Sequence, residues 1–278
     1  MSFFTSRRSA ILAALFSAVV LFASVSLAQQ YPSPAPAAPP QGAQGTQATP
    51  PAPRKLNPKE EADYKALLAL PNGDAATADK KIQLGQQFLQ KYPDTRYQES
   101  VYNQIVSAYY AKQDWFDFYA NADRVLGIDP DDVDVLTVYG WVIPHLYNKD
   151  EPDADKKLDK GETYEKHAID VIASLPKPDS LTEDQFAQAK QQQLEEAHSG
   201  LGLIYFRRQD FANSVKELQL ATQGNTSPDQ TDLFALGVGL QQLNRNGEAA
   251  DAFTKCSQAS GALQDRCKQM ADQAKSAK

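Results

Sequence analysis

A repeating pair of positions, about 34 residues apart, constrains the fold of this 278-residue chain more than any other feature. Each pair combines a residue that is small in most copies with a large one three positions later. The four pairs are Val106–Tyr109, Gly140–Ile143, Gly202–Tyr205 and Gly237–Leu240. The first two pairs lie 34 residues apart, the last two lie 35 apart, and 62 residues separate the middle two. A period of this length is typical of proteins that stack copies of one supersecondary unit.

The units of this repeat are predicted to be helical. Apolar residues recur at three- and four-residue spacing, which places them on one face of a helix, as in the run Leu233, Leu236, Leu240 and Leu243. Turn-forming residues separate the periodic segments, at Pro93-Asp94, Asp129-Pro130-Asp131, Pro176–Pro178, Ser227-Pro228 and Ser260-Gly261. Strand signals are weak. The sequence therefore predicts an all-α fold without a β-sheet.

Further positions follow the pairs in the two clearest units. After Tyr205 come Asp210, Phe211, Ser214, Leu218 and Ala221, and after Leu240 come Ala249, Phe253 and Cys256. This pattern resembles the tetratricopeptide repeat (TPR), a helical hairpin in which small residues stand where its two helices cross closely. The resemblance covers about residues 58–277. It implies a right-handed α-solenoid of TPR-like hairpins with a C-terminal capping helix, since one hairpin cannot bury its apolar face alone.

The unit that begins near Val133 departs from this pattern. Pro144 falls late in its first helix and must kink or end that helix. The 62-residue spacing to the next unit requires an insertion, and the acidic segment 147–157 is predicted to be a loop within it. A single long helix is then predicted from Glu183 to Arg208.

The first 56 residues are predicted to precede the folded part of the chain. A pair of arginines near the start is followed by an uncharged apolar run that ends at Ala28. These features predict a secretory signal peptide over residues 1–28, cleaved after Ala28. An uncleaved membrane anchor is the alternative, because the run is just long enough to span a bilayer. Residues 29–56, rich in Pro, Ala and Gln, are predicted to be a disordered linker before a repeat domain at 57–278.

Charge and motifs argue against several classes of function. A net charge of −7 is unsuited to nucleic-acid binding, which needs clustered Lys and Arg. The three histidines are isolated, and the Gly-x-Gly segments lie within helical periodicity instead of following a strand. The acidic residues from Asp150 to Glu162 fail the register of an EF-hand, so a solvated loop is expected, with a loose cation site as the alternative. We expect no catalytic residue, no cofactor and no metal site, and no enzymatic activity.

The resemblance also implies where a partner would bind. In TPR proteins the first helix of each hairpin lines the concave face, and we carry that face over to ten positions. They are Asn103, Ser107, Tyr110, Ser199, Leu203, Phe206, Arg207, Phe234, Val238 and Gln241. Members that hold a peptide's terminal carboxylate do so with Lys and Asn at such places. No Lys occurs among these ten residues, so that ligand is not expected, and an extended peptide or an amphipathic helix is.

These features together predict a non-catalytic scaffold or adaptor for proteins of the cell envelope. The signal segment predicts export to the periplasm or the extracellular space, with membrane contact only if that segment stays uncleaved. A binder of a non-protein envelope ligand, such as cell-wall glycan, is the alternative, with Trp115 and Trp141 as candidate contacts.

A disulfide between Cys256 and Cys267, the only two cysteines, is expected from export, which exposes thiols to oxidants. The two residues flank the Ser260-Gly261 break at similar distances, so an antiparallel hairpin would bring them level. A bridge there would fasten the closing helix, predicted from about Ala262 to Lys275, over the end of the array. Two reduced, buried cysteines are the alternative.

Overall fold

The computed structural model describes residues 57–225 and 227–277, and every structural statement below concerns those residues. The predicted signal peptide and linker, residues 1–56, lie outside them. All regular structure in the described part is α-helical, in eleven helices, which confirms the all-α prediction. None of these helices is long and apolar enough to cross a bilayer.

Four helices build the first two hairpins. They are α2 (Pro58–Leu68), α3 (Ala75–Lys91), α4 (Gln98–Lys112) and α5 (Trp115–Ile128). Aspartates start the second helix of each hairpin: the Asp74 side chain accepts a hydrogen bond from the Ala76 amide, and the Asp114 side chain accepts one from the Asp117 amide. Such caps satisfy amides that have no partner within the helix.

Three helices form the middle of the molecule: α6 (Val133–His145), α7 (Ala154–Ser174) and α8 (Glu183–Arg207). The long helix α8 confirms the prediction for that segment, and α6 ends one residue after Pro144. The predicted acidic loop is corrected from 147–157 to 147–153, because α7 begins at Ala154. Ala154 and Leu158 lie one helical turn apart and are both buried, so packing extends the helix into the acidic segment.

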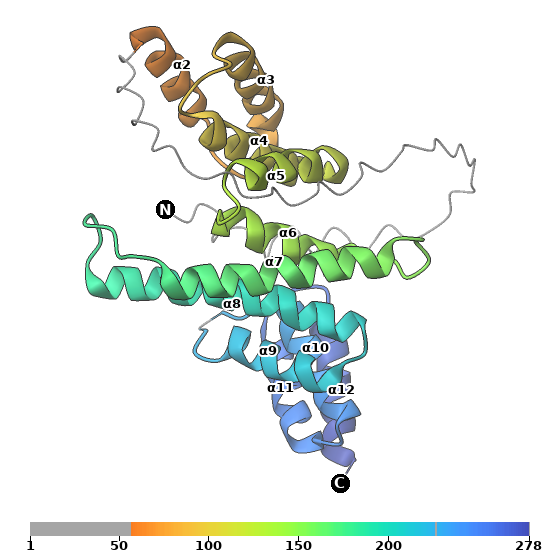
Figure 1. The fold of residues 1–278 in the computed structure, drawn as a ribbon. Coiled ribbons are helices and arrows are strands. Elements are labelled where there is room, and N and C mark those ends of the chain that lie inside the picture. The colour runs from red at the N-terminus through yellow and green to blue at the C-terminus, as the bar shows by residue number, and fades with distance from the viewer. Residues whose placement is uncertain (1–56, 226, 278) are drawn as a thin grey trace, which may run out of the picture.

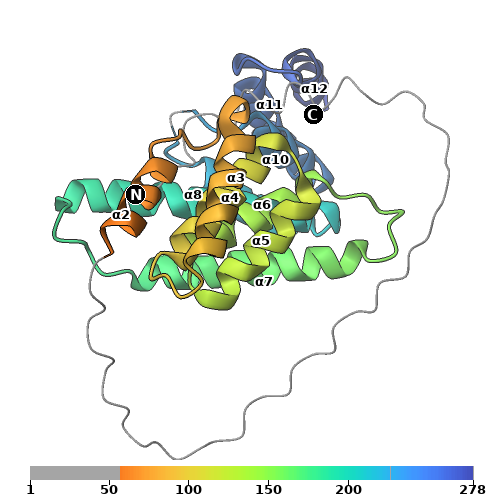
Figure 2. The ribbon, with the colours of Figure 1, turned by 90° about the horizontal axis from the view of Figure 1, so that it is seen from above.

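The chain closes with α9 (Phe211–Thr222), α10 (Gln230–Gln242), α11 (Asn246–Gln258) and α12 (Gln264–Ser276). α12 matches the predicted closing helix and packs on α11. In Figure 1, α7 and α8 lie across the middle, with α2–α5 on one side and α9–α12 on the other. Seen from above, α3, α4 and α5 run across the direction of α7 and α8 (Figure 2).

The small residues of the repeat lie where the two helices of one hairpin cross. A Cβ atom added to Gly202 of α8 would lie 2.7 Å from the Leu218 side chain of α9. One added to Gly237 of α10 would lie 2.5 Å from the ring of Phe253 in α11. These contacts explain why glycine and a large residue recur in the sequence at this fixed distance.

The turn inside the regular hairpins also repeats. Gln113, Gln209 and Asn244 each have a positive φ, at 59°, 61° and 59°, and each stands four residues after the large residue of its repeat pair. A residue in the left-handed region ends a helix and reverses the chain. Three hairpins therefore share one turn geometry, while the hairpin of α6 and α7 has the longer insertion loop instead.

Candidate functional site

A cavity of about 700 Å³ opens between the insertion loop and the ends of α8 and α10. Its walls come from segments up to almost one hundred positions apart in the sequence. The lining residues are Tyr147, Asn148, Lys149, Asp150, Phe206, Arg207, Gln209, Phe211, Val238 and Gln242. Because three separate elements meet here, the cavity exists only once the hairpins have stacked.

The apolar wall of the cavity comes from the turn between α8 and α9. Gln209 ends α8 with its positive φ, and the reversal brings Phe211 back beside Phe206, with ring centroids 6.1 Å apart in an edge-to-face arrangement. Val238 of α10 adds a β-branched side chain to the same cavity. This wall suits an apolar side chain of a ligand.

Arg207 provides a fixed cation in the cavity. Its Nε donates to the carbonyl oxygen of Pro144 at 2.8 Å, in the last turn of α6, where carbonyls lack partners within the helix. A cation at a helix C-terminus is also favoured by the helix dipole. Burial lowers the pKa of the Arg207 guanidinium, and the nearby Tyr147 opposes that effect. The surrounding protein thus removes water from this charge.

The neighbouring Arg208 has a different environment. It forms ion pairs with Asp159 and Glu162 of α7. Burial acts to raise the pKa of Glu162, but hydrogen bonds from Lys166, Arg208 and Tyr205 outweigh it and lower the pKa to about 2. Arg208 therefore joins α7 to α8, and its charge is fully matched by acids within the protein.

Comparisons with protein families and with curated proteins each gave no match. Among solved structures, one match is TTC0263, described as a thermophilic TPR protein in Thermus thermophilus. It shares 15% sequence identity, with a TM-score of 0.46 over 78% of this chain and 98% of that chain. Similarity this low says nothing about ligands, and the hairpins themselves carry the assignment of the fold. The described residues form a TPR-like array.

Three of the ten predicted groove residues line the cavity of this TPR-like array: Phe206, Arg207 and Val238. The other lining residues were not predicted. Most of them belong to the insertion loop or to helix ends, which the repeat pattern does not cover. The acidic insertion itself was the one sequence signal for a feature beyond the regular array.

Four predicted groove residues are buried, and the prediction was wrong for them. The exposed fractions are 2% for Ser107, 8% for Tyr110, 5% for Ser199 and 4% for Leu203. The Ser199 hydroxyl donates to Asp232 of α10 at 2.9 Å, and Leu203 belongs to a core shared with α9, α10 and α11. Neighbouring helices therefore cover positions that the family pattern assigns to a free face.

The remaining three lie outside the cavity. Asn103 donates to the Asp132 carboxylate at 2.7 Å and so joins α4 to the start of α6. Phe234 lies under the Arg266 guanidinium of α12, 4.8 Å from its ring centroid. Gln241 is half-buried beside Gln242, which does line the cavity. The closing helix thus occupies part of the surface that the sequence assigned to a ligand.

The two tryptophans proposed as glycan contacts pack inside the array. Trp141 is 9% exposed and belongs to the main core, and Trp115 is half-buried against the same core. The Tyr110 ring lies between them, with centroids 5.9 Å from Trp115 and 6.5 Å from Trp141. Their positions favour a structural role over a sugar-stacking platform.

The acidic insertion holds no candidate metal site within the described part of the chain, where no three potential ligands come together. Lys157 instead forms ion pairs with Glu151 and Asp153, at 2.5 and 3.3 Å. The Asn148 side chain accepts from the Asp150 amide at 3.1 Å, which gives the loop a local turn.

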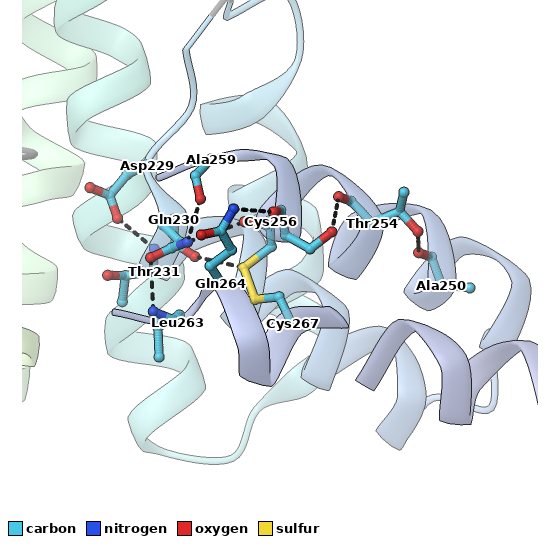
Figure 3. The surroundings of a disulfide bond; sticks show 11 residues. Asp229, Gln230, Thr231, Ala250, Thr254, Cys256, Ala259, Leu263, Gln264 and Cys267 are labelled. Carbon is cyan, nitrogen blue, oxygen red and sulfur yellow. Dashed lines mark hydrogen bonds between the residues drawn. A yellow bond between two sulfur atoms is a disulfide. The ribbon is translucent and has the colours of Figure 1, made fainter. Parts of the chain in front are cut away.

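The structure joins Cys256 and Cys267 in a disulfide bond, with Cα atoms 5.7 Å apart. Figure 3 shows the Gln230 side chain beside it. Gln230 donates from Nε2 to the carbonyls of Cys256 and Ala259, and its Oε1 accepts from the Leu263 amide at 3.0 Å. The start of α10 is thereby linked to the end of α11 and to the residue just before α12.

A second cavity, of about 450 Å³, lies between α9, α10 and α11. Leu233, Leu236 and Leu240 contribute its apolar side, and Glu248, Asp251 and Lys255 contribute charges of both signs. It contains none of the predicted groove residues. The larger cavity therefore remains the candidate site.

Proposed function

We propose that this chain is a non-catalytic, TPR-like scaffold that binds a segment of a partner protein in the cavity between the insertion loop, α8 and α10. The observation that carries this proposal is the lining of the cavity, where Phe206, Phe211 and Val238 lie beside amide side chains and a cation. Helical repeat arrays bind partners on the surfaces that stacked helices create.

The amide side chains of the cavity support a peptide ligand. Asn148, Gln209 and Gln242 each offer both donors and acceptors, which is what the N–H and C=O groups of an extended peptide require. The apolar wall can receive one anchoring side chain of that peptide. Recognition of extended peptides combines these two elements, main-chain hydrogen bonds and side-chain pockets.

The proposed place of action is outside the cytoplasm, in the cell envelope. Two features support it: the signal-peptide pattern of residues 1–28 and a disulfide within the array, since disulfides persist mainly in oxidising compartments. Mass spectrometry of the protein from the producing cells should find an N-terminus at Gln29. Recovery of a chain that still begins at residue 1 would contradict the cleavage.

Site-specific photocrosslinking tests the binding surface. A photoreactive residue at Gln242 should form an adduct with one defined protein in envelope extract, and one at the exposed Ala212, which does not line the cavity, should not. A synthetic peptide of the crosslinked segment should bind the full chain. Val238→Asp should weaken that binding at least about tenfold, the equivalent of 1.4 kcal/mol.

Two controls complete this test. Circular dichroism of the Val238→Asp variant should match that of the unaltered protein, so that loss of binding is not loss of fold. Identical adducts from positions 212 and 242, or a peptide that binds the variant equally well, would rule out this cavity as the partner site.

A further inference from the structure

We propose that Arg207 reads an acidic side chain of the partner, so that the cavity selects a peptide segment with an aspartate or glutamate close to an apolar residue. This inference rests on the proposed function and adds the chemical class of its ligand. It is argued from the partners of Arg207, from the charges around it and from the apolar wall beside it.

The side chain of Arg207 is held in place and is still largely unused. The hydrogen bond from Nε to the Pro144 oxygen, 2.8 Å long, engages one of the five N–H donors of the guanidinium. Among the described residues, no carboxylate lies within ion-pair distance of Arg207. Both terminal nitrogens therefore keep their donors for a ligand, on a side chain that its own hydrogen bond already orients.

The adjacent arginine shows what this chain does with a structural cation. Arg208 has two carboxylates, from Asp159 and Glu162, while Arg207 has a carbonyl oxygen only. A guanidinium that the protein partly desolvates without an anionic partner is unfavourable by itself, and an acid brought by a ligand relieves that cost. Arg is also the side chain whose planar fork matches a carboxylate with two parallel hydrogen bonds.

The other charges of the cavity leave it positive. Lys149 and Arg207 are its cations, and Asp150 is its one acid. Asp150 forms no ion pair with either cation among the described residues, so it does not neutralise the site. The backbone amide of Asp150 is bonded to the Asn148 side chain at 3.1 Å, which holds that part of the loop in a turn. The balance favours a ligand that carries a negative charge.

The neighbours of Arg207 define what accompanies the acid. Phe206 precedes it in α8, and Phe211 lies against Phe206 with ring centroids 6.1 Å apart. Val238 belongs to the same cavity. A peptide that places an apolar side chain against this wall brings its next few residues within reach of Arg207. The expected ligand is therefore an apolar residue with Asp or Glu one to three positions away.

Paired peptide arrays test this specificity. The probes are heptapeptides with amidated C-termini, containing Phe and a glutamate one, two or three positions later, each beside a copy in which glutamine replaces the glutamate. The labelled full chain should bind the best glutamate peptide about tenfold more tightly than its glutamine copy. Arg207→Gln should reduce this preference to less than about twofold, whereas Arg124→Gln on the exposed surface of α5 should leave it unchanged.

The arms of this experiment separate the possible failures. Absence of binding to every peptide would count against the proposed function as a whole. Binding without a preference for glutamate, or a preference that survives in Arg207→Gln, would overturn the role of Arg207 alone. A preference seen only among peptides with free C-termini would mean that a terminal carboxylate is the ligand and would also overturn the proposal. The comparison of the two peptide sets on the unaltered protein does not depend on the folding of any variant.

Discussion

At the scale of single residues, Asp232 is the side chain whose environment differs most from that of an ordinary aspartate. It is 4% exposed, in the first turn of α10, and accepts a hydrogen bond from the Ser199 hydroxyl at 2.9 Å. Burial and the nearby Asp229 raise the pKa of Asp232 well above its usual range, and the hydrogen bond from Ser199 only partly offsets them. The folded protein therefore holds a proton here more tightly than the unfolded chain does.

This shift makes the stability of the array depend on pH. For an acid whose pKa is raised on folding, stability is fully present below the unfolded pKa, about 4, and falls as pH rises through the folded pKa. Asp232→Asn keeps an acceptor for Ser199 and has no charge to desolvate. We expect the variant to gain on the unaltered protein as pH rises from 4 to 7, by about 1 kcal/mol or more at pH 7.

Urea unfolding at the two pH values measures this effect. The comparison is needed because other carboxyls act in the opposite direction: a hydrogen bond from His198, for example, lowers the pKa of Glu217. Asp251→Asn, at an exposed position of α11, serves as the matched control and should change neither value. An Asp232→Asn variant that is less stable at pH 7 would show that the acid is ionised and satisfied in the folded state.

At the scale of helices, the hairpins are held together by matched volumes at the crossing of their two helices. Gly202 faces Leu218 and Gly237 faces Phe253, in both cases 16 residues later. The hairpin of α4 and α5 has the opposite order at the same spacing, with Val106 on the first helix and Ala122 on the second. Both of these residues are 0% exposed. The sum of volumes, and not glycine itself, is what this crossing requires.

Gly237→Ala tests the close crossing of α10 and α11. The added methyl group would lie 2.5 Å from the buried ring of Phe253, so one of the helices must shift. We expect the free energy of unfolding to fall by about 1–3 kcal/mol. Gly127→Ala in α5 is the control, because a Cβ there meets nothing within 4 Å. It should be neutral or stabilise by up to roughly 1 kcal/mol.

Both variants can be compared by thermal unfolding followed by far-UV circular dichroism. Equal melting temperatures for Gly237→Ala and the unaltered protein would show that the crossing has room for a methyl group. Such a result would remove the physical reason for the small–large pattern of the repeat.

At the scale of the whole molecule, an array of hairpins must end without exposing its core. α12 covers α11, with Cys267, Ala271 and Ala274 buried beneath it. Arg266 and Lys268 on the same helix are exposed, so the outer surface of the closing helix is polar, as a terminal cap requires. The disulfide and the Gln230 hydrogen bonds fasten this helix in two independent ways.

Reduction tests the contribution of the disulfide to the whole array. Closing a loop with a sequence separation of 11 should contribute about 2–3 kcal/mol to the free energy of unfolding through the entropy of the unfolded chain. Dithiothreitol should lower the urea midpoint of the unaltered protein accordingly. It should leave a Cys256→Ala, Cys267→Ala variant unchanged. Because Gln230 still links α10 to the start of α12, the helical content at room temperature should stay the same after reduction.

Thiol labelling under non-reducing conditions provides the second measurement. Both cysteines of the exported protein should resist labelling until the protein is unfolded and reduced. Labelling of the unfolded but unreduced protein at both positions would mean that the two thiols are merely packed together. A urea midpoint that ignores the reductant would lead to the same conclusion.

The helices, their hairpins and the closing helix could all be predicted from the order of the residues alone. Those features depend on interactions between residues close in the chain, such as the caps at Asp74 and Asp114 and the left-handed turn at Gln209. The small–large pairs also report a contact between helices, because that contact recurs at a fixed distance in every copy. Repetition thus made a tertiary contact visible in the sequence.

Which surface stays open depends instead on how the hairpins stack. Ser199 and Leu203 lie on the predicted face of α8 but are covered by the following hairpin, while the insertion loop extends the open surface at Arg207. The bond from Arg207 to Pro144 joins residues 63 positions apart, across an insertion that no other hairpin of the described chain contains. A repeat pattern describes what its copies share, and this cavity is built where one copy differs, from contacts that form only when α6, α8 and α10 stack.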